Sequence, residues 1–317
     1  GFVSKLQTEY LDWQMCVTTT REVQVGNGRY WGASHYWQLN SESPSTALGI
    51  ILRKGTANLS RIFSETIKYI GAGWENSNDE RAIKAAYSHV YNGDLTYNGN
   101  SGCYRADSAV AYLIISDEDE RSVGGDISQR YYADEYKPLE HEDYPQNFVN
   151  YFKQIFPDKR MTVNSIIVKP GDTACMKKQD AKDANGQIIA KSHYGFRYSE
   201  LSQLTGGGVG SICEADFSTS LNLFIDKIQD SLSSVTLECA PYNGNVTVNI
   251  TPTPNPAVTS RVEGANLYFN TPVAAGHRVE VRYQCQEVRT PSSIGPVPQA
   301  EVGFFGRIWG FIKGLFL

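Results

Sequence analysis

Residues 109–116 read Ala-Val-Ala-Tyr-Leu-Ile-Ile-Ser, a continuous apolar run. Runs of this kind are typical of strands that are buried on both faces of a parallel sheet. The run leads into four consecutive acidic residues, Asp117 to Glu120. Ligands of open α/β sheets bind beyond the carboxyl ends of the strands, so Asp117 is well placed to bind Mg²⁺, which takes one or two carboxylates. A solvated loop after the strand is the alternative interpretation.

Helical and strand patterns alternate on both sides of this run. Residues 60–70 and 79–91 have helical spacing, and the Gly-Ala-Gly sequence at 71–73 is typical of a helix C-terminus. Residues 21–46 are rich in turn-forming and aromatic residues and predict an irregular segment. The other predicted elements are strands at 12–20, 48–52, 163–168 and 209–212, and helices at 148–156, 198–204 and 217–232. The alternation predicts an α/β fold with a doubly wound, mostly parallel sheet over residues 1–235.

The pattern changes after residue 235. A period near two predicts short strands and a small antiparallel β module over residues 236–285. These predicted strands lie at 234–238, 245–250, 265–269 and 278–283. Residues 286–302 are rich in proline and predict a linker. The apolar residues of the tail at 303–317 have near-helical spacing, with glycine at every fourth position from Gly306 to Gly314, and predict an amphipathic helix that contacts a membrane surface. Docking of that helix on a protein is the alternative.

Composition and cysteine usage limit the possible functions. The 317 residues carry a net charge of -5 without a basic stripe, which argues against nucleic-acid binding. Six cysteines without a Cys-x-x-Cys pair predict three disulfides in an oxidising compartment, whereas six free thiols in the cytosol are the alternative. Fifteen pairings are possible. The positions of the predicted strands favour Cys175 with Cys213 and Cys239 with Cys285, and elimination leaves Cys16 with Cys103.

Common catalytic motifs are missing from the sequence. It contains no Gly-x-Ser-x-Gly, His-Glu-x-x-His or P-loop sequence. The glycine run at 206–208 lies between a predicted helix and a predicted strand, which is the wrong order for a phosphate-binding loop. None of the five histidines has an evident nucleophile partner. The sequence therefore predicts that the chain is not an enzyme, with a hydrolase that uses the acidic loop as a weaker hypothesis.

The order of several segments resembles bacterial von Willebrand factor A-type domains of the cell surface or periplasm. The most specific of them is the apolar strand that ends in Ser-Asp-Glu-Asp, within residues 111–119. The other matching segments are 12–20, 71–73 with 79–83, 198–201 with 205–207, and 211–213 leading into 216–217.

Members of that family bind Mg²⁺ at a metal-ion-dependent adhesion site built from three loops. The resemblance implies that Asp117 is the aspartate of the third loop. The second loop usually supplies a threonine, which is absent here, so Asp79 or Glu80 is expected to replace it. In the family, the bound Mg²⁺ keeps an open position that takes a carboxylate from a protein ligand.

The first loop of that site, Asp-x-Ser-x-Ser, is missing from this chain. In the family, the strand before it is central and would lie between the strands predicted at 12–20 and 109–116. The resemblance therefore predicts a chain truncated before this strand, or a strand supplied by a partner, and Mg²⁺ only where the loop is supplied. It implies an adhesion protein of the cell envelope, periplasmic, secreted or on the cell surface. The alternative is a metal-independent interaction scaffold that associates through its surface or its tail.

Overall fold

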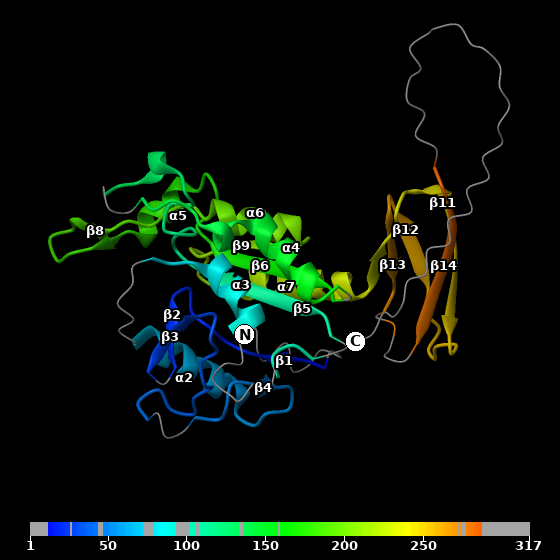
Figure 1. The fold of residues 1–317 in the computed structure, drawn as a ribbon, viewed down its shortest axis with the longest axis horizontal. Helices are drawn as coiled ribbons and strands as arrows, with labels where there is room; N and C mark the ends of the chain where they lie inside the picture. Colours follow the sequence, from blue (N-terminus) through cyan, green and yellow to red (C-terminus); the bar gives the residue numbers. More distant parts are fainter. Residues whose placement is uncertain are drawn as a thin grey trace, which may run out of the picture. The chain divides into compact units, whose positions relative to one another are not determined.

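The computed structural model describes residues 12–25, 27–43, 47–72, 79–92, 102–105, 108–132, 136–157, 159–271, 273 and 277–286. The chain divides into two compact units, one ending at Ile228 and the other starting at Gln229 (Figure 1). The predicted tail at 303–317 and almost all of the predicted linker lie outside the described residues. Within the described residues, no helix is long and apolar enough to cross a membrane.

A three-stranded parallel sheet forms the centre of the first unit. It consists of β5 (Val110–Ile115), β6 (Met161–Ile167) and β9 (Val209–Ser211), in the order β5-β6-β9. The ladder pairs Ile114 with Ser165 and Ser165 with Val209. All residues of β6 after Met161 are buried, which agrees with its central position. The α/β class with parallel strands is thus confirmed, but a doubly wound sheet is not.

Strand β5 departs from the prediction because it lies at the margin of this sheet. It was expected to be buried on both faces, yet Ala111 is exposed and Ile115 is 51% exposed. Of its six residues, only Ile114 is fully buried. Among the described strands, β5 has one hydrogen-bonded neighbour, β6, and only one of its faces is covered. The continuous apolar run therefore predicted more burial than this strand has.

Six helices are present in the described part of the chain. They are α2 (Leu59–Ala72), α3 (Ala82–Asn92), α4 (Pro145–Ile155), α5 (Thr173–Gln179), α6 (Phe196–Leu204) and α7 (Ser218–Leu232). One face of the sheet is covered by α3, α4 and α6, whose apolar side chains form a core with Ile114, Val163 and Ile167. Short 3-10 turns lie at Ile127–Gln129 and His141–Asp143.

Helix α7 packs closely against β9. A Cβ atom at Gly210 would lie 2.4 Å from Ser220 Oγ, and one at Gly208 would lie 3.0 Å from the Phe224 ring. Glycine at these two positions lets the helix approach the strand. Within the glycine run at 206–208, Gly208 thus serves packing against α7, whereas a Cβ at Gly207 would lie 1.8 Å from the carbonyl oxygen of Val163 in β6.

The N-terminal part of the first unit contains two short antiparallel pairs. Strand β1 (Gln14–Met15) pairs with β4 (Leu52–Arg53), and β2 (Glu22–Val25) pairs with β3 (Gly28–Trp31). The strand predicted at 12–20 is thus only two residues long, because main-chain groups at its end and beyond it bond to loop residues. The Trp37 indole donates to the carbonyl of Met15, and the His35 N–H donates to that of Val17. The hairpin β2-β3 was not predicted, since residues 21–46 were expected to be irregular.

A second apolar core joins this N-terminal part to α7. It contains Trp13, Trp37, Leu52, Leu59, Ile62 and Ile225. The Cys16–Cys103 disulfide and a hydrogen bond from the Gln14 side chain to the carbonyl of Gly102 connect β1 to the segment that leads into β5. Another hairpin, β7 (Ala181–Lys182) with β8 (Ile188–Ala190), projects from the same unit.

The second unit is an antiparallel β module. One sheet has the order β10-β13-β12, from Ser234–Thr236, Asn266–Phe269 and Ser260–Glu263, and β11 (Pro241–Thr251) pairs with β14 (Arg278–Cys285). Alternate side chains of these strands form its apolar core, among them Leu267, Val279 and Val281. The Cys239–Cys285 disulfide links the start of the module to the end of β14. Together with Cys175–Cys213, the three predicted disulfide pairings are all confirmed.

Candidate functional site: the acidic loop after strand β5

The acidic loop, residues 116–126, leaves the carboxyl end of β5 and runs between α3 and α6. Its first four acidic residues, Asp117 to Glu120, have different environments. Asp119 and Glu120 are completely buried, whereas Asp117 and Glu118 are half-buried. The loop is therefore not simply a solvated turn.

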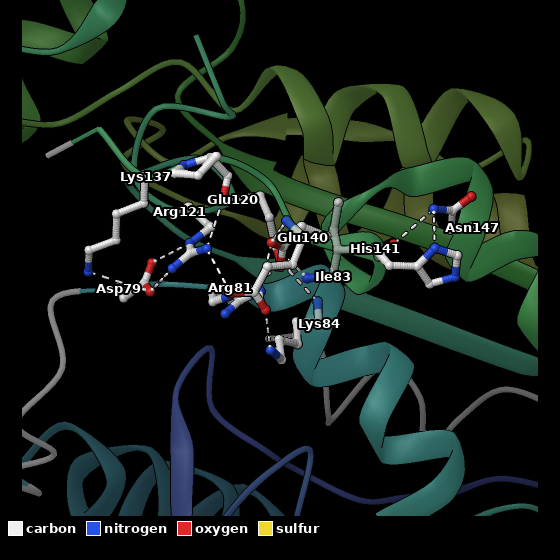
Figure 2. Close-up of polar contacts among 12 residues, drawn as sticks. Asp79, Arg81, Ile83, Lys84, Glu120, Arg121, Lys137, Glu140, His141 and Asn147 are labelled. Atoms are coloured by element: carbon white, nitrogen blue, oxygen red, sulfur yellow. Dashed lines mark hydrogen bonds and ion pairs between the residues drawn. The ribbon is translucent and has the colours of Figure 1, made fainter. Parts of the chain in front are cut away.

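Glu120 caps the N-terminus of α3. Its carboxylate accepts hydrogen bonds from the N–H groups of Ile83 at 2.7 Å and Lys84 at 3.0 Å (Figure 2). Helix α3 has no acidic residue in its own first turn, so Glu120 satisfies N–H groups that the helix leaves unpaired. Burial raises the pKa of the Glu120 carboxyl well above its ordinary value.

Asp119 caps a different helix, α6. Both of its carboxylate oxygens accept from the N–H of Arg197, at 3.0 and 3.1 Å. The residue before α6 is Gly195, which has no side chain to cap the helix. Burial raises the pKa of Asp119 to about 7 although these hydrogen bonds oppose the shift. At Gly124 a Cβ would lie 2.2 Å from Asp119 Oδ2, and φ is +60°, so only glycine fits there.

An ion-pair network fixes the chain just before α3. Arg81, 3% exposed, donates from Nε to Asp143 at 2.8 Å and from its terminal nitrogen to the other oxygen of Asp143 at 2.7 Å. Glu140 accepts from Arg81 and from Lys84, both at 2.8 Å, and these two bonds lower the pKa of Glu140 to about 2. Figure 2 shows Arg81, Lys84 and Arg121 gathered around Glu140.

The two predicted second-loop ligands, Asp79 and Glu80, are held by basic side chains. Asp79 forms an ion pair with Arg121 at 3.0 Å and lies 3.5 Å from Lys137 (Figure 2). Glu80 accepts from the Ser116 hydroxyl at 2.8 Å and pairs with Arg21 at 3.3 Å. The structure thus brings Glu80 next to the end of β5, but both carboxylates already have cationic partners.

Asp117 differs from its neighbours. Its main-chain carbonyl accepts from the N–H of His193 at 3.1 Å, which connects the loop to the segment before α6. Its half-buried carboxylate forms no hydrogen bond or ion pair with any residue that the structure describes. Asp117 is therefore a carboxylate on a fixed loop whose charge has no partner within the described fold.

The donor set does not fit a resident metal ion. In the described part of the chain, no group of three or more histidine, cysteine, aspartate or glutamate residues could hold one. Binding at Asp117 and Glu80 would require the ion pair of Glu80 with Arg21 to open. Asp79 would similarly have to leave Arg121. The metal site expected at Asp117, Glu80 and Asp79 stays a prediction without a matching ligand cluster.

His89 contacts the hydroxyl of Ser34, a pairing that the sequence did not predict. His89 lies 2.9 Å from Ser34 Oγ and hydrogen-bonds on its other side to the Tyr104 hydroxyl, which in turn contacts that of Tyr112. Ser34 and His89 are both buried, so this chain of polar groups has no direct access for a substrate. Burial also lowers the pKa of His89 to about 4. The arrangement is a hydrogen-bond network of the core.

Sequence reasoning missed the residues that build the loop, namely Arg81, Asp119, Glu120 and Asp143. A signal for two of them existed, because α3 lacks an acidic first turn and α6 lacks a capping side chain. Such helices need a cap from elsewhere, but the spacing does not say which residue supplies it.

No protein-family model and no curated protein matches this chain at a significant level.

Proposed function

We propose that the chain is a metal-independent protein-binding module of the cell envelope, in which Asp117 contacts the ligand directly. The observation that carries this proposal is the contrast between Asp117 and its neighbours. Asp119 and Glu120 are used to fix the loop, and Asp79 and Glu80 have cationic partners. Asp117 alone among these five presents a carboxylate without one in the described fold. A half-buried carboxylate of this kind favours a ligand that offers a lysine or arginine side chain.

The three disulfides support the location. Disulfides persist in secreted, periplasmic and surface proteins and are rare in the cytosol. The described residues contain three bridges and no free cysteine. An oxidising compartment follows from the bridges, and the cell envelope is the more specific part of the proposal. The proposed role is binding rather than catalysis.

Site-specific photo-crosslinking tests the proposal. A photoreactive residue at position 117, expressed in the producing organism, should crosslink one discrete partner, which is then purified. With that partner, Asp117→Asn should weaken binding by about tenfold or more, because a desolvated charge loses its counter-charge. The matched control is Asp226→Asn, a change at an exposed aspartate of α7, which should leave the affinity unchanged.

The same measurement in Mg²⁺ and in EDTA separates this proposal from metal-dependent adhesion. Equal affinities in the two buffers agree with direct contact. Binding that is lost in EDTA and restored by Mg²⁺ would support a metal-dependent site and overturn ours. Unchanged affinity of Asp117→Asn in both buffers would remove Asp117 from the interface altogether.

A further inference from the structure

A pocket of about 510 Å³ lies beside α6 in the first unit. It is bounded by the end of the acidic loop, the 3-10 turn at 127–129, the segment that follows β6, and α6 itself. Its volume falls within the range of sites for small organic ligands, about 300–1,000 Å³. Asp117 lies outside its lining. The side chains that matter for binding here are those of Asp126, Gln129, Phe196, Arg197, Glu200 and Gln203.

The guanidinium of Arg197 is held in place without a ligand. Its Nε donates to the carbonyl of Gly124 at 3.0 Å, and its Nη1 donates to Glu200 at 2.9 Å. The main-chain N–H of the same residue donates to Asp119. Within the described residues, Nη2 of Arg197 has no hydrogen-bonded partner. A pre-organised donor of this kind is available to a ligand at little cost in side-chain entropy.

Two carboxylates of the lining keep acceptor oxygens available. One oxygen of Asp126 accepts from the hydroxyl of Ser128 at 2.7 Å and from its N–H at 2.9 Å, and these bonds lower the pKa of Asp126. The other oxygen receives only a 3.4 Å contact from the amide of Gln129. Glu200 uses one oxygen for Arg197, and its second has no partner among the described residues. Fixed donors and acceptors therefore line the same space.

This mixture of donors and acceptors selects the class of ligand. An ammonium group only donates, so it cannot satisfy Arg197, and an anion only accepts, so it cannot satisfy Asp126 or Glu200. A neutral hydroxyl group donates and accepts, and it can satisfy all three. The side-chain amides of Gln129 and Gln203 add further groups that do both. The lining thus matches a ligand that carries several neutral hydroxyl groups.

An aromatic ring stands among these polar groups. Phe196 lines the pocket and is 44% exposed, and its ring lies edge-on to that of Tyr194, with 5.8 Å between the ring centroids. A sugar ring has hydroxyl groups around its edge and apolar C–H groups on its faces, so one face can pack on an aromatic ring while the edge forms hydrogen bonds. The combination of Phe196 with the polar lining therefore favours a sugar.

The lining fits a sugar better than it fits nearby or terminal segments of the same chain. Residues 133–135, which closely follow the 3-10 turn, read Ala-Asp-Glu and would bring further negative charge to Asp126 and Glu200. The tail at 303–317 is apolar apart from two cations and offers few groups for polar partners of this kind.

We propose that this pocket binds a short neutral oligosaccharide, with one sugar ring packed on Phe196 and its hydroxyl groups hydrogen-bonded to Arg197 and Glu200. Asp126 and the two glutamines contact the neighbouring hydroxyl groups. This inference does not rest on the proposed role of Asp117, which lies outside the pocket.

Calorimetric titration of the full, disulfide-bonded chain tests the proposal. The probes are four neutral trisaccharides: maltotriose, cellotriose, mannotriose and tri-N-acetylchitotriose. At least one should bind at a single site with a Kd below about 1 mM. Spermidine and trigalacturonate, a cation and an anion, should bind at least about tenfold more weakly. The proposal is overturned if none of the trisaccharides binds, or if either charged probe binds as tightly as the best of them.

Two pairs of variants locate the bound sugar. With the best trisaccharide, Phe196→Ala should weaken binding by about tenfold or more. Tyr144→Ala, at a similarly exposed aromatic residue (42% against 44%), should stay within about twofold of the wild type.

The second pair exchanges exposed glutamines that each form one hydrogen bond on a helix. Gln203, which contacts Ser199, lines the pocket, whereas Gln146, which contacts Asn150, lies on α4. Gln203→Ala should weaken binding by about fivefold and Gln146→Ala should leave it unchanged. If Phe196→Ala and Gln203→Ala both bind the sugar as the wild type does, the sugar binds elsewhere and the proposal is wrong.

Discussion

Asp119 and Glu120 are adjacent in the sequence, but their carboxylates cap two different helices. Asp119 accepts from the N–H of Arg197 at the start of α6, and Glu120 accepts from Ile83 and Lys84 at the start of α3. Two helices on one face of the sheet are therefore joined through two consecutive residues of one loop. This junction fixes the position of Asp117, two residues before Asp119.

The buried carboxyl of Asp119 should make stability depend on pH. Its pKa is about 7 in the folded chain and near 3.8 otherwise, so between these values the folded state binds more protons than the unfolded state. The free energy of unfolding should therefore fall as pH rises from about 4 to about 7. Asp119→Asn should remove this dependence, leaving a variant at least as stable as the wild type near pH 8.

Urea unfolding at several pH values measures this effect. The amide oxygen of the introduced asparagine can still accept from α6, so loss of the cap is not expected. Asp226→Asn, at an exposed position, serves as the control and should follow the wild type. An Asp119→Asn variant with the same pH slope as the wild type would contradict the prediction.

The buried ion pair of Arg81 with Asp143 should be essential for stability. Arg81→Ala would leave the carboxyl of Asp143, which is 0% exposed, without its cationic partner, and should cost about 3–5 kcal/mol of the free energy of unfolding. Lys84→Ala removes a neighbouring cation that pairs with the more exposed Glu140, and should cost less than about 1 kcal/mol. Chemical denaturation of both variants tests the contrast, which would fail if the two losses were equal.

The parts of the fold that depend on local pattern were predictable from the sequence. The helices α2 and α3 and the parallel strands β5, β6 and β9 follow hydrophobic periodicity, and their positions agree with the prediction to within a few residues. The strand at 12–20 was wrong in length because its later groups bond to loop residues such as His35. Periodicity carries no information about which loop a main-chain group meets.

The candidate site was predictable only in part. Position after an apolar strand identified the acidic loop, but it did not separate Asp119 and Glu120 from Asp117. That distinction depends on the helix ends that approach the loop from residues 83 and 197, far away in sequence. Asp79 was similarly expected to be free for a metal, and its pairing with Arg121 across 42 positions has no local signal.

The titration of His89 should change the free energy of unfolding with pH in the opposite direction to the titration of Asp119. Its pKa is about 4 in the folded chain, below the ordinary 6.5, so the unfolded state binds more protons between these values. The free energy of unfolding should accordingly fall as pH decreases from about 6.5 to about 4, by up to about 3 kcal/mol. His89→Gln should reduce this loss, although it also lowers stability at neutral pH by changing bonds to Ser34 and Tyr104.

The test compares how the free energy of unfolding changes with pH in the variant and in the wild type. Asp119 contributes equally to both proteins, so the difference between them reports on His89. His141→Gln, at an exposed histidine, is the control and should keep the wild-type slope. If His89→Gln also keeps it, His89 is not the group that titrates.

The disulfide in the β module should account for much of its stability. Cys239 and Cys285 are 46 positions apart, and opening a loop of that length should cost about 4 kcal/mol in the chain-entropy model. The double variant Cys239→Ser/Cys285→Ser should lose protection from hydrogen exchange in β11–β14. The matched pair Cys175→Ser/Cys213→Ser should leave these strands unaffected, because that bridge lies in the first unit. Equal exchange in both double variants would contradict the assignment.

The Cys16–Cys103 bridge spans 87 positions and encloses both α2 and α3. A protease that cuts anywhere between these cysteines would produce two fragments that remain covalently joined. The nicked protein would migrate as one band on a non-reducing gel and as two after reduction. In a protease-rich extracellular setting, the bridge thus turns cleavage of this region into an event that need not release either half of the chain.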